Sequence, residues 1–342
     1  MTWTIRWNSR ANSWPFCTEW ATRRSAMRRE KLPKTIPGSA ISTGSMSYFS
    51  KLAGGRRRVY PEFVLIERGD GALWVDSSRM EPAFLDRLAD ADKLFTDASC
   101  VIVKDQRKIK VGRVNVTLAG RPRSIYVKRY NAFSLRYKLL SRFTQSGAFR
   151  ALQGAAILRA GQISTATPVA AVEHRSAGTL SKSFYLSAEI HGGKTADAYW
   201  CAELAGLSGA AGFNSRRRFL ARLAALFASL HGQQIYHNDL KDANILVVGA
   251  AKVSDLQLFL LDLEGVRRYR CLSLQRKVKN LVQLNRTLGR YLRPSAKLSF
   301  LKIYLGNDFN IRQSRRQWIH SIVTATQRLD EVKARRGVMP LS

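Results

Sequence analysis

The stretch His237–Glu264 constrains the fold more than any other part of this chain. It reads as a loop of polar residues followed by two short apolar runs, Ile245–Val248 and Leu256–Leu261. A segment containing Gly, Ser and Asp separates the two runs, which suits a β-hairpin. A hairpin brings the start of its first strand next to the end of its second. We therefore expect Asp262 to lie beside Asn244.

Two polar residues of this loop have a spacing that is typical of phosphotransferases. Asp239 and Asn244 have the same spacing as the catalytic base and the metal-binding Asn in the kinase pattern H-R-D-x-x-x-x-N. Such a pair is common in isolation, but the hairpin adds Asp262, and two convergent oxygen ligands can hold Mg²⁺. We interpret His237 as a structural hydrogen-bonding residue rather than a base. The order and spacing of the set together predict a phosphotransferase.

The block resembles the lipopolysaccharide core kinase family, bacterial enzymes that phosphorylate heptose or Kdo. That family shows H-G-D-L-K-x-x-N-x-L-V, then a strand and D-L-D-G-V-R. This chain has Asn238 for the Gly and Glu264 for the second Asp, and Val266-Arg267 completes the match. The resemblance extends over about 74–306. It implies an α+β, bilobal, protein-kinase-like fold with a small β-rich N-lobe and a larger, mostly helical C-lobe.

The resemblance also implies a reaction and roles for the residues. The expected activity is ATP-dependent phosphorylation of a heptose or Kdo hydroxyl in the lipopolysaccharide inner core. ATP and Mg²⁺ are the expected cofactors, with Asn244 and Asp262 as metal ligands and Glu264 as a supporting carboxylate. Asp239 would orient the acceptor hydroxyl and take its proton, while Lys241 would neutralise charge on the transferring phosphoryl group. The expected partners are the lipid A/core oligosaccharide acceptor and an anionic membrane surface.

The segment before this block reads as β-strands that carry the lysine of a kinase. Cys100–Val116 and Ile125–Tyr130 are rich in β-branched residues and are joined by a turn at Gly120–Arg123. Lys128 lies in the second run, where the family places the lysine that contacts the α- and β-phosphates. The segment Lys104–Gly112 has no G-x-G-x-x-G sequence, so backbone amides and cations would have to cover the phosphates.

A helix predicted at 146–160 raises a question about Lys128. In protein kinases this helix supplies a Glu that pairs with the strand lysine, but here it contains no acidic residue. Either another carboxylate orients Lys128 or the N-lobe is arranged differently. Two more strands follow. The second leads into a hinge at Glu189–His191, where we expect Glu189 and Ile190 to contact adenine through the backbone.

The remainder of the chain reads as helical. Residues 215–231 repeat apolar side chains every three to four positions and end at Gly232, which predicts a helix that braces the catalytic loop. Further helices are predicted at 277–288, 298–305 and 311–333. The exit from Gly265 to the next helix is short and contains no Ala-Pro-Glu, unlike the activation segment of a protein kinase. A compact acceptor such as a sugar fits this exit better than an extended peptide.

Composition adds an electrostatic constraint. The formal net charge of the 342 residues is +33, which predicts a polyanionic partner. The cations are spread along the chain rather than gathered with aromatics, so no specific nucleic acid is expected. The four cysteines are widely spaced, and neither a disulfide framework nor a zinc site is indicated. No apolar run is long enough to span a bilayer. We expect a cytoplasmic enzyme, peripheral on the cytoplasmic face of the inner membrane.

These patterns divide the chain into three regions. Residues 1–58 are rich in Arg, Ser, Thr and Trp, and we expect a basic arm without regular structure. The arm is either a solvated tail or a contact for an anionic membrane, and part of it could precede a true start at Met46. The N-lobe is predicted at 59–190 and the C-lobe at 191–335.

Two other functions remain open on the sequence alone. A small atypical protein kinase or small-molecule kinase would share the same motifs. The missing helix acid and the missing Gly-rich loop also allow a pseudokinase that binds anionic membrane or nucleic acid through its basic surface. Mg²⁺-dependent ATP turnover would separate this last alternative from the enzymes.

Overall fold

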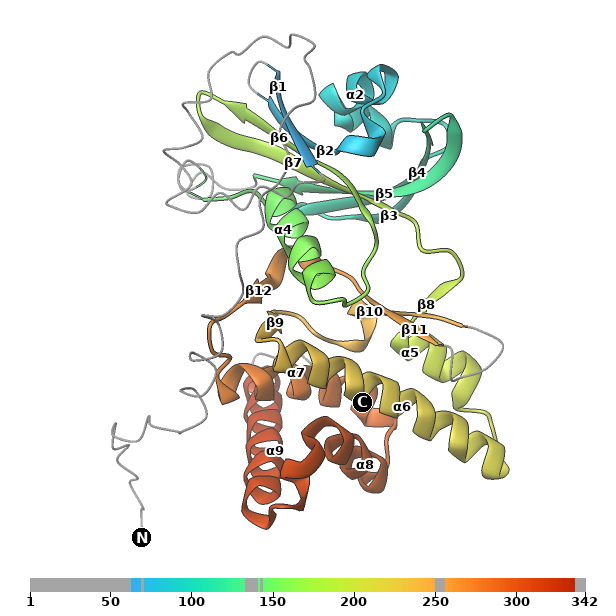
Figure 1. The fold of residues 1–342 in the computed structure, drawn as a ribbon, viewed down its shortest axis with the longest axis vertical. Helices are drawn as coiled ribbons and strands as arrows, with labels where there is room; N and C mark the ends of the chain where they lie inside the picture. Colours follow the sequence, from blue (N-terminus) through green and yellow to red (C-terminus); the bar gives the residue numbers. More distant parts are fainter. Residues whose placement is uncertain (1–62, 69–70, 133–140, 142–143, 250–255, 336–342) are drawn as a thin grey trace, which may run out of the picture. The chain divides into compact units, whose positions relative to one another are not determined.

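A seven-stranded sheet, followed by helices and two smaller sheets, makes up the described part of the chain (Figure 1). The computed structural model describes residues 63–68, 71–132, 141, 144–249 and 256–335. The basic arm predicted at 1–58 lies outside these residues, as does most of the turn between the two apolar runs. The predicted α+β fold class is confirmed.

The large sheet is antiparallel throughout and has the order β1-β2-β6-β7-β5-β4-β3. Its strands are β1 (Phe63–Arg68), β2 (Gly71–Asp76), β3 (Val101–Asp105), β4 (Ile109–Leu118), β5 (Arg121–Asn131), β6 (Pro168–Ser176) and β7 (Thr179–Ala188). Lys128 lies on β5, between Val111 of β4 and Tyr185 of β7. Its backbone is therefore fixed by strands on both sides.

The turn between β4 and β5 is shorter than the sequence predicted. Ala119 and Gly120 have φ of 52° and 66°, and β5 already begins at Arg121. Positive φ at both central residues belongs to the tight hairpin turn whose twist matches that of the flanking strands. The predicted turn at Gly120–Arg123 was wrong in its second half because pairing with β4 continues up to this tight turn.

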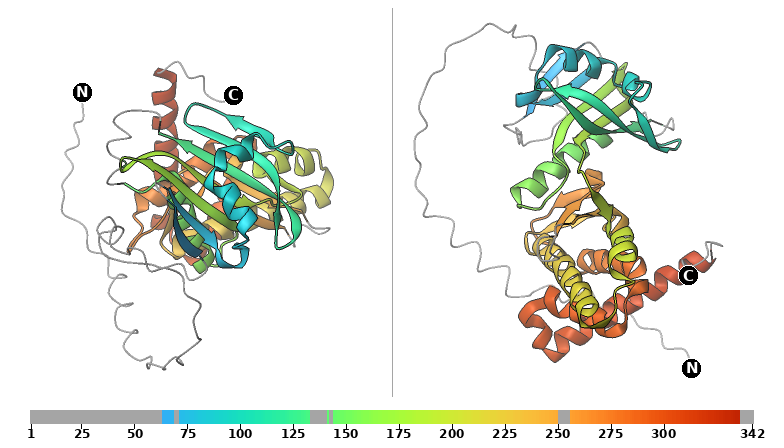
Figure 2. Two further views of the ribbon diagram at one scale, coloured as in Figure 1. Left: turned by 90° about the horizontal axis from the view of Figure 1, so that it is seen from above. Right: turned by 90° about the vertical axis from the view of Figure 1, so that its right-hand side faces the viewer.

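Different helices cover the two faces of the large sheet (Figure 2). On one face, Phe84 and Leu88 of α2 (Pro82–Ala89) and Leu94 of η3 (Ala91–Phe95) belong to the sheet core. The chain between β2 and β3 thus forms an α-helix followed by a 3₁₀ segment. On the other face, α4 (Gly147–Ala160) packs against β6 and β7.

The helix α4 also packs against the turn η7 (Leu263–Gly265) and against strand β12. Its first turn is capped by the Ser146 hydroxyl, which accepts a hydrogen bond from the Phe149 N–H at 3.0 Å. Most of its buried residues are small: Gly147, Ala148, Ala151, Gly154 and Ala155. A Cβ on Gly154 would lie 2.2 Å from the Leu263 carbonyl oxygen, so the contact with η7 requires glycine. The core that includes α4 continues into the C-terminal helices.

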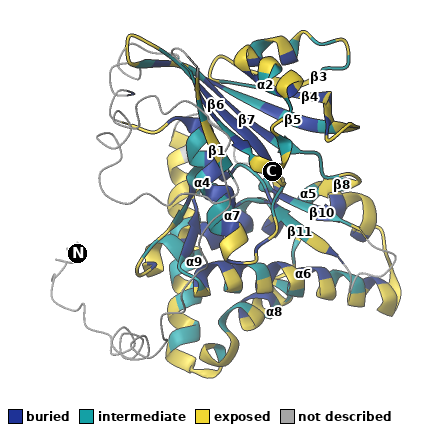
Figure 3. Cartoon of the chain, turned by 45° about the horizontal axis from the view of Figure 1, so that its top comes forward, coloured by how far each residue is buried: buried dark blue, intermediate teal, exposed yellow. Residues whose placement is uncertain are grey.

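The second part of the chain contains the predicted helices. The helices are α5 (Ala196–Tyr199), α6 (Gly209–Gly232), α7 (Leu274–Arg286), α8 (Pro294–Leu305) and α9 (Arg312–Arg335). The small sheets contain β8 (Gly193–Thr195), β10 (Ile245–Val248) and β11 (Gln257–Leu260), and β9 (Ile235–His237) with β12 (Val266–Arg268). Figure 3 shows buried residues along α6 and on the central strands. Within the described residues, no helix combines the length and apolar character that crossing a bilayer requires.

The helix α6 begins earlier than predicted, at Gly209 rather than at 215. Glycine has a low helix propensity, so Gly209 and Gly212 do not predict a helix here. Tertiary contacts favour it. Gly212 packs directly on the backbone of Leu207, and Arg216 donates hydrogen bonds to the Leu204 and Leu207 carbonyls at 3.0 and 2.7 Å.

His231, near the end of α6, is a core residue that links three helices. It is 2% exposed, and its ring nitrogens contact Asn280 Oδ1 of α7 at 3.1 Å and the Tyr304 hydroxyl of α8 at 2.8 Å. The Asn280 amide in turn donates to the His237 carbonyl at 2.6 Å. Desolvation by burial lowers the pKa of His231 to about 4. His231 is therefore neutral at physiological pH.

The neutral state of His231 predicts a loss of stability in mild acid. Its pKa is 6.5 ordinarily and about 4 in the folded chain. Between these values the unfolded state binds more protons, so stability falls as pH drops through 6.5. Between pH 7 and pH 5, we expect the free energy of unfolding to fall by about 2 kcal/mol from this residue. Urea unfolding at both pH values measures the loss, which His231→Gln should reduce. An equal loss in the variant would assign it to other groups.

The close contact of α4 with η7 predicts that Gly154→Ala destabilises the fold. The added methyl group would displace either the helix or the backbone of Leu263, at a typical overpacking cost of about 1–3 kcal/mol. The helix-propensity gain of about 1 kcal/mol opposes this cost. Gly232→Ala, at the end of α6, is the matched control because no atom lies within 4 Å of its added Cβ. Urea unfolding should separate the two variants; equal stabilities would contradict the assigned role of Gly154.

Candidate active site

His237 fixes the polar loop to the end of the hairpin. It is 1% exposed, and its Nε2 hydrogen-bonds the Leu261 carbonyl at 2.8 Å, while its Nδ1 accepts the Asp239 N–H at 3.2 Å. Burial lowers the pKa of His237, and the hydrogen bond to Leu261 opposes that shift only in part. A neutral ring with both nitrogens engaged positions other groups, so the predicted structural role of His237 is confirmed.

The loop brings Asp239, Lys241 and Asn244 together. The Asn244 amide donates to the Asp239 backbone carbonyl at 2.7 Å and to its Oδ2 at 3.1 Å. Lys241 Nζ lies 2.8 Å from the same Oδ2. The Asn244 amide nitrogen is therefore directed toward Asp239. Asp239 thus contacts the side chains of both Asn244 and Lys241, as their spacing in the sequence allows.

The predicted hairpin exists and delivers Asp262 to the predicted place. Strands β10 and β11 are antiparallel with Ile245 opposite Leu260, and the Leu261 N–H donates to the Asn244 carbonyl at 2.9 Å. Asp262 follows directly with φ of 56°, in the left-handed region. Such a backbone is uncommon for a residue with a side chain, although Asp tolerates it better than most. It turns the chain sharply from β11 into η7.

Lys128 reaches Asp262 across 134 positions of sequence. Lys128 Nζ lies 2.5 Å from Asp262 Oδ1, and the two side chains are 20% and 33% exposed. Burial acts to raise the pKa of Asp262, but the charge and hydrogen bond of Lys128, together with weaker contributions that include the charge of Lys241, hold this pKa below its ordinary value. The helix at 147–160 contains no acidic residue to orient Lys128. The carboxylate that does so comes instead from Asp262, at the end of the hairpin.

The helix α4 contributes a cation instead of an acid. Arg150 Nη2 lies 3.9 Å from Glu264 Oε2, one turn before the contact of Gly154 with η7. Burial raises the pKa of Glu264, against the opposing charge of Lys128. Arg150 was not predicted from the sequence, because the protein-kinase pattern places a carboxylate in this helix. The available signal was the extra acid in Asp-Leu-Glu together with an Arg in the first turns of the helix.

The predicted hinge residues lie between β7 and β8. The Glu189 N–H donates to the Ser124 carbonyl at 3.0 Å. The Glu189 carboxylate lies 3.2 Å from Arg113 Nη1 and 3.6 Å from His191 Nδ1. Ile190 continues the same connection and is half-buried. These two residues make no recorded contact with the loop or hairpin residues within the described part, so their adenine-binding role stays a prediction.

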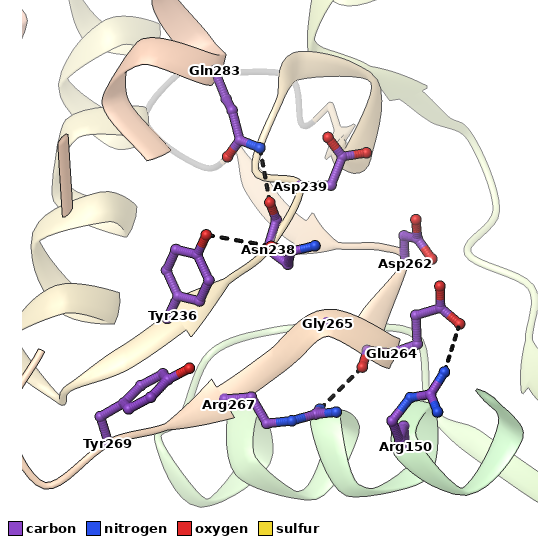
Figure 4. A pocket seen from close by; sticks show the side chains of 10 residues that line it. All are labelled: Arg150, Tyr236, Asn238, Asp239, Asp262, Glu264, Gly265, Arg267, Tyr269 and Gln283. Carbon is purple, nitrogen blue, oxygen red and sulfur yellow. Dashed lines mark hydrogen bonds and ion pairs between the residues drawn. The ribbon is translucent and has the colours of Figure 1, made fainter. Parts of the chain in front are cut away.

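A cavity of about 710 Å³ opens on one side of the two aspartates (Figure 4). Its walls come from β9, the loop, η7, β12, α4 and α7. The lining residues are Arg150, Tyr236, Asn238, Asp239, Asp262, Glu264, Gly265, Arg267, Tyr269 and Gln283. Of the residues to which the sequence assigned a role in the site, Asp239, Asp262 and Glu264 line it. Lys128 and Asn244 contact the two aspartates without lining the cavity.

The chemistry of the donor set fits a hard cation. Asp262 provides carboxylate oxygens and Asn244 an amide oxygen, and oxygen ligands of this kind suit Mg²⁺, which usually takes its other ligands from water and phosphate. Within the described residues, no group of three or more His, Cys, Asp or Glu side chains is placed to hold a metal by itself. Asp262 and Asn244 therefore fit a Mg²⁺ ion whose remaining ligands are water and phosphate oxygens.

The strand order, the pairing of Lys128 with the aspartate after β11, and the Asp-x-x-x-x-Asn loop together define a phosphotransferase of protein-kinase-like fold. The family comparison specifies the class further. The model of the lipopolysaccharide kinase (Kdo/WaaP) family matches residues 98–320. The chain belongs to this family, whose members transfer phosphate to sugar hydroxyl groups, and it is accordingly an ATP-using kinase of lipopolysaccharide biosynthesis.

No curated protein matches the chain. A solved structure described as WaaP in complex with acyl carrier protein matches with 17% sequence identity and a TM-score of 0.49, covering 69% of this chain and 92% of that chain.

The strand pairing that forms one wall of the cavity was not predicted from the sequence. After η7 the chain forms β12, which pairs with β9 so that Val266 faces His237 and Arg267 faces Tyr236. The short exit from Gly265 was predicted correctly, but each strand contains only three residues, too few for a periodicity signal. Arg267, Tyr236 and Tyr269 therefore escaped notice as cavity residues.

The contact between Gly265 and Asn238 predicts a reciprocal pair of substitutions. A Cβ on Gly265 would lie 2.7 Å from Asn238 Cβ, whereas the next atoms are 3.5 and 3.6 Å away. Gly265→Ala should push the loop away from η7, and small displacements of this kind cost about ten- to a hundredfold in turnover. Asn238→Gly removes the colliding atom, so the double variant should recover most of the activity.

A double-mutant cycle on phosphate transfer checks this prediction. The coupling should be large and favourable, with the double variant more active than Gly265→Ala alone. Strictly additive losses would show that Gly265 is required for another reason, such as backbone freedom.

Proposed function

We propose that the chain phosphorylates a hydroxyl of a Kdo or heptose residue in the lipopolysaccharide inner core. One observation supports this most strongly: the hairpin and loop bring Asp239, Asn244 and Asp262 to one place, with Lys128 bound to Asp262. Phosphoryl transfer needs mainly positioning and charge neutralisation, and this set supplies an acceptor-side carboxylate, oxygen ligands and a cation.

The nucleotide side of the site uses Lys128, Asn244 and Asp262. Lys128 would bind the α- and β-phosphates, and its ion pair with Asp262 holds its side chain in position before nucleotide binds. Asn244 and Asp262 would hold Mg²⁺, which neutralises phosphate charge when bound. Glu264 supports this end of the site as a partly buried carboxylate beside Arg150.

The acceptor side uses Asp239 and Lys241. Asp239 would accept a hydrogen bond from the sugar hydroxyl and take its proton while the hydroxyl oxygen bonds to the γ-phosphorus and the bond from that phosphorus to ADP breaks. The Asn244 amide fixes Asp239 from one side. Lys241, 2.8 Å from Asp239, is placed to offset negative charge on the group in transfer.

The proposed division into an N-lobe at 59–190 and a C-lobe at 191–335 puts its boundary at the connection that contains Glu189 and Ile190. Because the Glu189 N–H already bonds Ser124, the groups proposed for adenine are the Glu189 carbonyl and the Ile190 backbone. The net charge of +33 supports an acceptor in lipid A/core oligosaccharide and a peripheral position on the anionic cytoplasmic face of the inner membrane.

Label transfer from γ-labelled ATP tests the proposal. The purified chain should label a Kdo- or heptose-containing core acceptor in the presence of Mg²⁺. Asp239→Asn should reduce the rate by about 10²–10⁴-fold, because general-base catalysis contributes on this scale. Asp262→Asn should also abolish most transfer, since Asn tolerates the left-handed backbone but removes the charge.

Asp308→Asn is the matched control, because Asp308 is exposed in η9 (Gly306–Asn310), away from the cavity lining. It should transfer at the rate of the unchanged chain. Label found only on protein would indicate a protein kinase, and transfer unaffected by Asp239→Asn would rule out the proposed base.

A further inference from the structure

The cavity beside Asp239 has two chemically different ends. At one end, which we call the catalytic end, are Asp239, Asp262 and Glu264. At the other are Tyr236, Tyr269 and Arg267. Figure 4 shows the two tyrosines on the side of the pocket opposite Asp262 and Glu264. A molecule that fills this space must meet acids at one end and aromatic and basic groups at the other.

Strand pairing creates this second end. Tyr236 of β9 is the direct cross-strand partner of Arg267 of β12. Tyr269 lies two positions beyond Arg267, and side chains two apart in extended chain share a face. The rings of Tyr236 and Tyr269 are 6.3 Å apart at 69°. Arg268 alternates to the opposite face, where its Nε donates to the Gln233 carbonyl at 3.3 Å.

Two cations of α7 extend this surface. The Arg276 guanidinium lies 4.2 Å from the Tyr269 ring centroid, and Lys279 Nζ lies 5.7 Å from that of Tyr236. Lys279 also donates to Asn238 Oδ1 at 3.1 Å, which keeps it beside the cavity. We call Tyr236, Arg267, Tyr269, Arg276 and Lys279 the basic-aromatic end. Its three cations pair with no carboxylate among the described residues, whereas each carboxylate of the catalytic end faces a cation.

Arg267 is oriented to bind a ligand. Its Nη1 donates to the Glu264 and Val266 carbonyls at 3.0 and 2.7 Å, which fixes the plane of the guanidinium. No other acceptor for this fork is recorded among the described residues, so its remaining N–H groups can bind an anion in a forked geometry. Burial and then the charge of Arg150 lower the pKa of Arg267, so a bound anion would also relieve a local excess of positive charge.

The two ends together select a kind of acceptor. We propose that the acceptor sugar carries a carboxylate or phosphate, which Arg267 binds with Arg276 and Lys279 while the sugar rests against Tyr236 and Tyr269. This inference rests on the proposed function, because Asp239 marks where the hydroxyl must lie. The cations of the basic-aromatic end are not offset by paired carboxylates among the described residues, whereas Lys241, Lys128 and Arg150 each face a carboxylate at the catalytic end. An anionic acceptor therefore places its charged group at the basic-aromatic end and its hydroxyl toward Asp239. A neutral sugar would have no such preference.

Paired variants of adjacent arginines test the proposal. Arg267→Gln and Arg268→Gln remove the same charge from opposite faces of β12. Steady-state transfer is measured with a Kdo-containing lipid A acceptor, with the same acceptor after methyl esterification of its carboxylates, and with the acceptor after enzymatic removal of its phosphates. In the unchanged chain, removal of the recognised anion should raise the acceptor KM by about tenfold or more, which identifies carboxylate or phosphate as its source.

Arg267→Gln should raise the KM for the intact acceptor by a similar factor. This variant should no longer distinguish the intact acceptor from the acceptor that lacks the recognised carboxylate or phosphate. Arg267→Lys, which keeps the charge but loses the fork, should be intermediate. Arg268→Gln should behave as the unchanged chain. Equal effects of the two glutamine variants, or unaltered discrimination in Arg267→Gln, would overturn the proposal.

Calorimetric binding of free Kdo and of inorganic phosphate separates this proposal from the proposed function. If Arg267→Gln abolishes binding and Arg268→Gln preserves it, the anion site is supported. If no label reaches a core sugar in that case, only the proposed function fails. Transfer that proceeds normally in Arg267→Gln means that the function holds and the anion site does not. If neither ligand binds and no sugar is labelled, both are wrong.

Discussion

The ion pair of Lys128 with Asp262 is the contact on which the site depends. It joins an interior strand of the large sheet to the residue that ends the hairpin. Partly exposed pairs of this kind contribute only about 0.2–1 kcal/mol to stability, so the pair cannot hold the two regions together. Packing does that: Gly154 of α4 approaches the Leu263 carbonyl so closely that no side chain fits. Packing fixes the two backbones relative to each other, and the ion pair then orients the Lys128 and Asp262 side chains.

This division of roles explains a departure from protein kinases. There a helix Glu orients the strand lysine. Here α4 uses Gly and Ala to approach η7, and its nearest charged contribution is Arg150, which faces Glu264. In this chain the helix supplies a cation and the loop supplies the acid, whereas in protein kinases the helix supplies the acid. Asp262 serves as the lysine's partner in this structure and as the proposed metal ligand, and both roles use carboxylate oxygens.

Local patterns allowed much of the site to be predicted from the sequence. The spacing from Asp239 to Asn244 and the two apolar runs before Asp262 are short-range features, and Lys128 lies in a run with clear strand composition. What could not be predicted depends on contacts between distant segments. The β9–β12 pairing involves three residues on each side, and the role of Gly154 appears only once Leu263 lies opposite. The earlier start of α6 likewise follows from contacts with Leu207, which override low helix propensity.

The same short pairing connects the fold to acceptor choice. The chain does not run on into a long activation segment after Gly265. The short exit instead returns as β12, and its alternation sends Arg267 into the cavity beside Tyr236 while Arg268 points away. The diffuse charge of +33 can attract any polyanion over distances up to a Debye length of about 8–10 Å. It cannot orient one. Orientation requires an uneven distribution of charge nearby, and the cavity provides it: the cations of the basic-aromatic end pair with no carboxylate among the described residues, whereas those at the catalytic end do.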